Sequence, residues 1–277
     1  MNIDAHQHYW QPARGDYGWL QPASGCLYAD FMPEQLKPLL TRHQFDRSII
    51  VQAAPTVAET EFLLAIAAKE DTVAGVVGWL DLTARDFIGQ WERLLENPRF
   101  VGLRPMIQDL PSEWILRERV VEHLRILADA GFPLDLQANP RHLPYLLRLF
   151  EQVPHLRAVV DHLAKPNIED GAMEPWAAQM TAIAAYPNTM CKLSGMVPER
   201  QNASWSTASI VPFAAHAIAI FGAERVMFGS DWPVCLLSAS YDQVVELHEA
   251  CLPAAWGEAE RANVCGRNAA RFYRLAT

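Results

Sequence analysis

The sequence predicts an α/β fold, a distorted (β/α)8 barrel formed by a single domain over residues 1–277. The first observation is length, since 277 residues suit one barrel of about 250 residues. The second is that eight short apolar runs alternate with helical segments along the chain. The third is that no glycine-rich nucleotide-binding motif follows any predicted strand. Periodicity alone leaves a large doubly wound sheet as the alternative architecture.

The predicted strands are continuous apolar runs, as expected for strands that are buried on both faces. They cover residues 1–5, 48–52, 73–79, 100–104, 132–136, 158–161, 189–193 and 225–229. Helices are predicted over 34–43, 59–69, 83–95, 113–130, 141–152, 175–185, 206–221, 241–250 and 258–273. Thr83 and Asp86 resemble a capping box for the third of these helices. Residues 10–31, rich in Trp, Tyr, Pro and Gly, are predicted to form a long loop that serves as a lid or pocket wall.

Composition narrows the class of protein. Apolar residues make up 51% and charged residues 20%, which is typical of a globular protein with a sizeable core. The net charge of −9 argues against a nucleic-acid or anionic-membrane partner. The five cysteines are widely spaced, which indicates neither a disulfide framework nor a zinc knuckle. No signal peptide is recognisable, so we expect a cytoplasmic protein whose partner is a small molecule.

His6 and His8 follow the first predicted strand. Alternate residues of an extended strand point to the same face, so both imidazoles point the same way. Such a pair suits a chelate or a hydrogen-bonding acid/base site. A His-x-His also occurs by chance, so the interpretation depends on partners from other strands.

Those partners are expected at the carboxyl ends of the strands, where a barrel places its active site. Nearly every predicted strand delivers a polar or titratable side chain to this end. Besides His6 and His8, the strand ends hold Gln52, Trp79, Asp81, Arg104, Gln137, His162, Lys192, Ser194, Ser230 and Asp231. The sequence therefore predicts a polar site at one mouth of the barrel.

Five segments together resemble the amidohydrolase superfamily, and within it the sugar-lactonase branch related to L-fuconolactonase and L-rhamnonolactonase. They are Ile3–His8 (IDAHQH), Gly102–Pro105 (GLRP), Asp161–Pro166 (DHLAKP), Lys192–Gly195 (KLSG) and Phe228–Pro233 (FGSDWP). The resemblance extends from residue 3 to about 273. It implies a distorted (β/α)8 barrel that hydrolyses lactones of sugar acids.

The resemblance also implies a set of metal ligands. His6 and His8 match the pair on the first strand, His162 the histidine of the sixth and Asp231 the aspartate of the eighth. Gln137 stands where two-metal members have a bridging lysine, so a binuclear centre is not expected. The four ligands are expected to hold one divalent ion or none, and Zn²⁺ suits three histidines and a carboxylate.

For lactone hydrolysis, Asp231 is predicted to be the general base and to return the proton to the leaving alkoxide. Partial burial is expected to raise the pKa of its carboxyl group. The alternative is that Asp231 only caps the loop. His162 is predicted to bind the metal or to donate a hydrogen bond to the lactone carbonyl. The alternative is that His162 has a purely structural role in the core. Without a metal, the histidines and Arg104 would stabilise the oxyanion.

The remaining candidates concern substrate binding. Arg104 is predicted to donate to substrate oxygens, with an internal salt bridge as the alternative. The side chains of Gln52 and Gln137 can donate and accept hydrogen bonds, which suits contact with a polyhydroxylated ligand. The alternative is that both residues anchor loops. Three aromatic residues are expected to form the walls of the pocket or part of the core: Trp10, Trp79 and Trp232. Lys165 and Lys192 are expected to supply charge near the site, without an assigned chemical role.

Two other functions compete with hydrolysis of a neutral sugar-acid lactone. One is a metal-dependent decarboxylase on the same barrel, which would need a tightly held Zn²⁺. The other is a non-catalytic protein that binds a small molecule. Metal removal separates the decarboxylase from the lactonase, and substitution of Asp231 separates an enzyme from a binding protein.

Overall fold

The computed structural model describes residues 1–275 and confirms the predicted barrel. Eight parallel strands pair in chain order. They are β1 Ile3–Gln7, β2 Arg47–Val51, β3 Val73–Gly78, β4 Phe100–Leu103, β5 Leu134–Leu136, β6 Ala158–Val160, β7 Thr189–Leu193 and β8 Val226–Phe228. Within the described residues, no helix is long and apolar enough to span a membrane.

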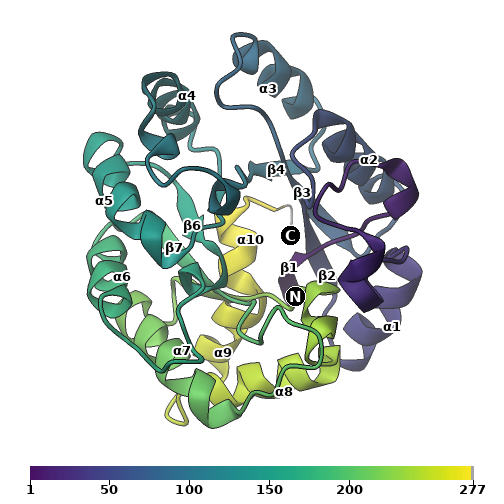
Figure 1. The fold of residues 1–277 in the computed structure, drawn as a ribbon, viewed down its shortest axis with the longest axis vertical. Coiled ribbons are helices and arrows are strands. Elements are labelled where there is room, and N and C mark those ends of the chain that lie inside the picture. The colour runs from purple at the N-terminus through teal and green to yellow at the C-terminus, as the bar shows by residue number, and fades with distance from the viewer. Residues whose placement is uncertain (276–277) are drawn as a thin grey trace.

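Most of the helices form an outer ring around the strands (Figure 1). The helices are α1 Pro33–Arg42, α2 Val57–Ala67, α3 Phe87–Leu95, α4 Glu118–Asp129, α5 Leu143–Gln152, α6 Trp176–Ala184, α7 Thr207–Phe221, α8 Tyr241–Cys251, α9 Glu258–Ala262 and α10 Asn268–Phe272. Proline and capping residues determine where some of these helices begin. Pro33 occupies the first turn of α1, and the Ser206 hydroxyl accepts from the amide of Ser209 at the start of α7.

Two apolar clusters hold the fold together. The larger lies between the strands and the surrounding helices. The smaller fills the barrel interior, where Ile3, Val51 and Val159 pack with Phe272 and Tyr273 at the end of the chain. α10 accordingly lies inside the ring of helices in Figure 1. The barrel is therefore a packed core and not a pore, and a ligand can be bound at its mouth.

The barrel closes between the end of β1 and the segment after β8. The amide of Asp231 donates to the carbonyl of His6 at 2.8 Å, and the amide of His8 donates to the carbonyl of Trp232 at 2.7 Å. Gly229 permits this approach, because a Cβ atom there would lie 2.6 Å from the Cβ of His6. Closure thus brings the first and last site segments together.

Asp4 supports the closure from the face of β1 that points toward α8. Its Oδ1 accepts from the amides of Ser230 at 2.9 Å and His6 at 3.2 Å, and its Oδ2 accepts from the hydroxyl of Tyr241 at 3.1 Å. Burial raises the pKa of Asp4 to about 6, although these hydrogen bonds act in the opposite direction. The carboxylate ties β1 to β8 and α8.

Some local predictions are wrong. Thr83 does not cap α3, because its hydroxyl donates to Asp81 at 2.6 Å and the helix begins at Phe87 with Asp86 at the N-cap position. The segment 113–130 is divided into a 3-10 turn, Trp114–Leu116, and α4. The segment 258–273 is divided by a π-helical turn, Asn263–Arg267. Residues 10–31 contain two 3-10 helices, Pro12–Arg14 and Pro22–Leu27.

We predict that Asp4→Ala lowers the free energy of unfolding by about 3 kcal/mol, because buried donors lose an ionic acceptor. Asp4→Asn should cost about 1 kcal/mol, since its carbonyl oxygen still accepts from both amides. Urea denaturation of the two variants beside the parent protein measures the difference. Equal losses for Asn and Ala would show that the hydrogen bonds do not stabilise the closure.

Candidate active site

Three imidazoles converge on one oxygen of Asp231 at the mouth of the barrel. The Oδ1 atom of Asp231 lies 3.3 Å from Nε2 of His8, 3.7 Å from Nε2 of His6 and 3.9 Å from Nε2 of His162. All four side chains are nearly inaccessible to solvent. The structure therefore brings together the four residues that the sequence predicts as a site, from β1, the end of β6 and the end of β8.

The backbone at two of these positions is strained. Residues His162 to Lys165 have φ values of 53°, 54°, 57° and 49°, and Asp231 has a φ of 56°. The left-handed region costs residues other than glycine roughly 1–2 kcal/mol each. The indole of Trp176 holds the first turn by donating to the carbonyl of Leu163 at 2.7 Å. Strain of this kind concentrates at functional sites, which supports a functional role for both turns.

Hydrogen bonds from the surrounding residues orient two of the imidazoles. Nδ1 of His8 lies 2.7 Å from the carbonyl oxygen of Val51, and its Nε2 lies 3.3 Å from Oδ1 of Asp231, so both ring nitrogens face oxygen acceptors. Nδ1 of His162 lies 2.9 Å from the hydroxyl of Ser194. Gly195 packs directly against the ring of His162. The Nε2 atoms of both rings therefore face the site.

The electrostatics differ from the sequence-based expectation for Asp231. Burial alone would raise the pKa of its carboxyl group, as predicted, but His162, His8 and His6 hold the pKa below its ordinary value. Burial lowers the pKa of His162, and burial and Lys192 together lower that of His6 well below its ordinary value. At neutral pH the site therefore combines an ionised carboxylate with neutral imidazoles at His6 and His162.

The donor set fits a single divalent ion by type and spacing. Tetrahedral donors held at metal distances of about 2.0–2.2 Å lie about 3.3–3.6 Å apart. Nε2 of His8 and Nε2 of His6 lie 3.3 and 3.7 Å from Oδ1 of Asp231, close to that spacing, and these three residues form one candidate ligand group. Nε2 of His162 is 3.9 Å from the same oxygen, but His162 lies outside that group. Two cations lie next to this set, since Nη1 of Arg104 is 3.3 Å from Nε2 of His6 and Nζ of Lys192 is 3.1 Å from its Nδ1.

Arg104 is clamped by Gln52. Its Nε and Nη2 atoms donate to the side-chain oxygen of Gln52 at 3.1 and 2.9 Å, and Nη2 also donates to the carbonyl of Gln52. Nη1 lies 3.6 Å from Asp161. Gln52 is fully buried, its side chain contacts Arg104 and Ala54, and it does not line the cavity, so it has the position of an anchor, which was the alternative for this residue. Arg104 has both of its predicted environments, a wall of the cavity and an internal ion pair.

A cavity of about 170 Å³ opens above Asp231. Its wall includes the predicted residues His8, Trp10, Arg104, Gln137, His162 and Asp231, and also Trp19, Ala53, Met106, Gln108, Asp109, Lys165, Glu199 and Val234. A larger hollow of about 760 Å³ shares His162, Lys165 and Glu199 with it. An ion pair of 2.5 Å joins Lys165 to Glu199 at this boundary.

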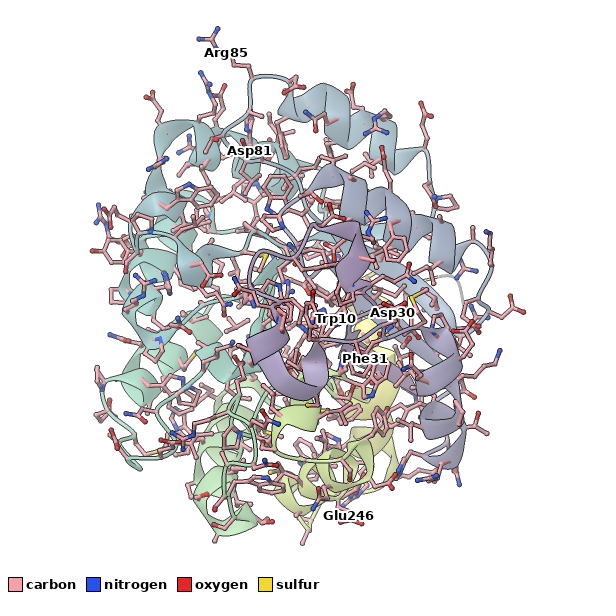
Figure 2. The ribbon with its side chains drawn as sticks, turned by 45° about the vertical axis from the view of Figure 1, so that its right-hand side comes forward. Trp10, Asp30, Phe31, Asp81, Arg85 and Glu246 are labelled. Carbon is pink, nitrogen blue, oxygen red and sulfur yellow. The ribbon has the colours of Figure 1, made fainter. Side chains whose placement is uncertain are left out.

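The loop over the cavity includes Trp10, whose ring packs against Phe31 with centroids 5.5 Å apart (Figure 2). Trp19 comes from the same aromatic loop and donates to the carbonyl of Ala53 at 2.8 Å. The aromatic content of residues 10–31 is the sequence signal that points to Trp19. The contributions of Met106, Gln108, Asp109 and Glu199 have no local sequence signal.

Two predicted wall residues lie elsewhere. Trp232 follows the left-handed Asp231 and packs its ring against Phe31, with centroids 5.3 Å apart. Trp79 is held against α2, because its amide and carbonyl both contact the Thr60 hydroxyl, at 2.9 and 3.3 Å. Neither residue lines the cavity, so for both the core alternative describes the structure better.

Comparison with known proteins agrees with this geometry. The family described as amidohydrolase matches residues 3–275. The chain belongs to the amidohydrolase family. It is 39% identical to an L-fucono-1,5-lactonase of Burkholderia ambifaria and 35% identical to one of Burkholderia multivorans, in each case over 99% of this chain and 96% of the relative. A crystal structure of a Burkholderia multivorans amidohydrolase with bound zinc superposes with a TM-score of 0.93, at 35% identity over the full length of both chains.

We predict that Gly195→Ala lowers turnover of this amidohydrolase by up to about 100-fold, because misplacement of a reacting group by about 1 Å costs that much. A Cβ atom there would lie 2.5 Å from Nδ1 of His162. Steady-state kinetics on the folded variant measures the effect.

Gly171→Ala is the matched control, because Gly171 has the same left-handed backbone, with φ of 64°, and open space around it. It should lose stability without losing turnover. Equal turnover in the two variants would show that the contact between Gly195 and His162 does not position the ring.

Proposed function

We propose that this amidohydrolase hydrolyses the lactone of a neutral sugar acid, of the class of L-fucono- or L-rhamnonolactone. The convergence of three imidazoles on the ionised Asp231, beneath a small cavity, is the observation that supports this most directly. The Burkholderia relatives named L-fucono-1,5-lactonase support the substrate class.

Asp231 acts as the general base. Its carboxylate is ionised at neutral pH and faces the cavity, so it can accept a proton from a water molecule that attacks the lactone carbonyl. As the bond between the carbonyl carbon and the ring oxygen breaks, the same group returns that proton to the departing alkoxide. The product is the open-chain hydroxy acid, and Asp231 is ionised again for the next turnover.

His162 and Arg104 stabilise the negative charge that develops on the carbonyl oxygen. When the hydroxyl of Ser194 donates to Nδ1 of His162, the ring has its proton on Nε2 and can donate into the cavity. Gln52 accepts from Nε and Nη2 of Arg104 but not from Nη1, so Nη1 can donate to the substrate. Preorganised donors in a site shielded from water are among the largest contributors to catalysis.

The cavity wall suits a neutral, hydroxylated ring. The side-chain oxygen of Gln137 is buried without a hydrogen-bond partner and can accept from a substrate hydroxyl. Trp10 offers an apolar surface for the face of the ring. Lys165 and Glu199 neutralise each other, and the Nη1 atom of Arg104 is assigned to the lactone carbonyl, so the wall residues that the structure describes offer no further cation for a second carboxylate.

The four ligand-type residues, His6, His8, His162 and Asp231, would hold at most one divalent ion, with Zn²⁺ favoured by the donor types. Such an ion would supply Lewis-acid polarisation of the carbonyl and a more acidic water. The roles given above to Asp231, His162 and Arg104 do not depend on it. A decarboxylase, in contrast, would require a firmly held ion, and a binding protein would require no base.

We predict that Asp231→Asn lowers lactone turnover by at least about 100-fold with the fold intact, which is the usual scale for loss of a general base. A pH-indicator assay on a panel of aldonolactones, with circular dichroism as the check on folding, tests this. Asp242→Asn on the exposed side of α8 is the matched control and should retain activity. An Asp231→Asn variant with full activity would contradict the assignment.

We predict that turnover persists after dialysis against a strong chelator, once the metal content has fallen to background. The physical reason is that Arg104 and His162 already supply the donors for the oxyanion. Activity that disappears on chelation and returns with Zn²⁺ would instead support a metal-dependent mechanism and revive the decarboxylase alternative.

A further inference from the structure

A layer of buried charge lies directly beneath the histidines. Lys192 on β7, Asp135 on β5 and Asp161 after β6 are all inaccessible to solvent. Nζ of Lys192 lies 2.5 Å from Asp135, 3.1 Å from Oδ1 of Asp161 and 3.1 Å from Nδ1 of His6. The hydroxyl of Tyr273, at the end of the chain, contacts both oxygens of Asp135 at 2.9 Å.

An ammonium group has three donors and no acceptor. Nζ of Lys192 donates to Asp135, lies 3.1 Å from Nδ1 of His6, and forms an ion pair with Oδ1 of Asp161 at 3.1 Å without a hydrogen bond, so these three groups are the ones that its hydrogens can reach. Because a buried charged group that lacks a partner is costly, the lowest-energy arrangement uses all three. In that arrangement Nδ1 of His6 accepts a hydrogen bond and therefore has no proton.

We infer that Lys192 is a positioning residue that fixes the tautomer of His6, with the proton on Nε2, and so directs an N–H group at the Asp231 carboxylate. Nε2 of His6 lies 3.7 Å from Oδ1 of Asp231, a distance that can shorten when substrate fills the site. The importance of this for catalysis rests on the proposed function of Asp231. The tautomer itself does not.

The opposite tautomer is less favourable. It would let Nδ1 of His6 donate to Asp161 at 3.4 Å and Nε2 accept from Arg104 at 3.3 Å. However, it would aim an N–H of Lys192 at an N–H of His6 across 3.1 Å, and within the described residues the other acceptor contacts of Nζ are those with Asp135 and Asp161. Arg104 has an alternative in the proposed tautomer, because its Nη1 lies 3.6 Å from Oδ2 of Asp161 and also borders the cavity.

This assignment affects metal binding. Nε2 of His6 is the nitrogen that faces Asp231, and a protonated nitrogen has no lone pair for an ion. An ion at His6, His8 and Asp231 would therefore have to displace that proton. Lys192 thus weakens metal binding while it keeps His6 as a donor to the carboxylate.

The direct test is ¹⁵N NMR of the intact protein labelled at histidine and stripped of metal with a chelator. Nitrogen chemical shifts separate protonated from unprotonated ring nitrogens, and a His6→Gln variant assigns the signals. We expect His6 to be protonated at Nε2 and His8 at Nδ1, where it donates to Val51. A His6 signal protonated at Nδ1 would overturn the inference, whatever the substrate of the enzyme proves to be.

A variant tests the cause. Lys192→Met with Asp135→Asn removes one charge of each sign and so keeps the buried layer balanced. We expect the His6 proton to move to Nδ1, Zn²⁺ affinity measured by competition with a chromophoric chelator to rise about tenfold, and kcat to fall about tenfold or more with little change in KM.

Tyr273→Phe is the matched control, because it removes a partner of Asp135 and leaves the contact between Lys192 and His6 in place. It should leave the tautomer and the Zn²⁺ affinity unchanged. An unchanged His6 tautomer in the double variant would overturn the role of Lys192. If the double variant misfolds, the parent protein decides the question, and a His6 protonated at Nδ1 there would also overturn the role of Lys192. Loss of activity in Asp231→Asn bears on the proposed function alone, so the two proposals fail separately.

Discussion

Two backbone hydrogen bonds between the end of β1 and the segment after β8 both close the barrel and build its site. They join His6 to Asp231 and His8 to Trp232, so these two segments of the candidate site cannot separate without opening the sheet. Asp4 reinforces them from the face of β1 that points toward α8. The geometry of the site is therefore maintained by the same interactions that maintain the fold, which is an effective way to hold catalytic groups in register.

A second constraint is the balance of buried charge. Arg104 and Lys192 lie beside His6, and Asp135 and Asp161 neutralise them beneath the histidines. Most barrels fill this interior with branched apolar side chains. A polar layer costs desolvation free energy, and it persists here where each charge has a partner. Burial and Lys192 lower the pKa of His6, although Asp161 acts in the opposite direction, and the three imidazoles hold the pKa of Asp231 below its ordinary value.

The sequence predicts the strands well because each is a continuous apolar run, and the site histidines well because strand ends share one mouth. It predicts less well which way a side chain turns after the strand ends. Trp232 turns into the core behind a left-handed residue, and Gln52 turns to clamp Arg104. The prediction of a raised pKa for Asp231 is wrong for a related reason. The burial of this carboxyl group could be predicted, but the three imidazoles that face it determine the direction of the pKa shift.

By itself, then, the sequence determines the alternation of strands and helices, the absence of nucleotide-binding motifs and the identities of His6, His8, His162 and Asp231 as a set. These properties depend on local patterns and on the common direction of parallel strands. Only the tertiary structure decides that Lys192 meets His6, that Glu199 borders the cavity and that Trp79 does not. Such contacts join residues far apart in the chain, and their geometry depends on strand register and loop conformation, which local sequence does not encode.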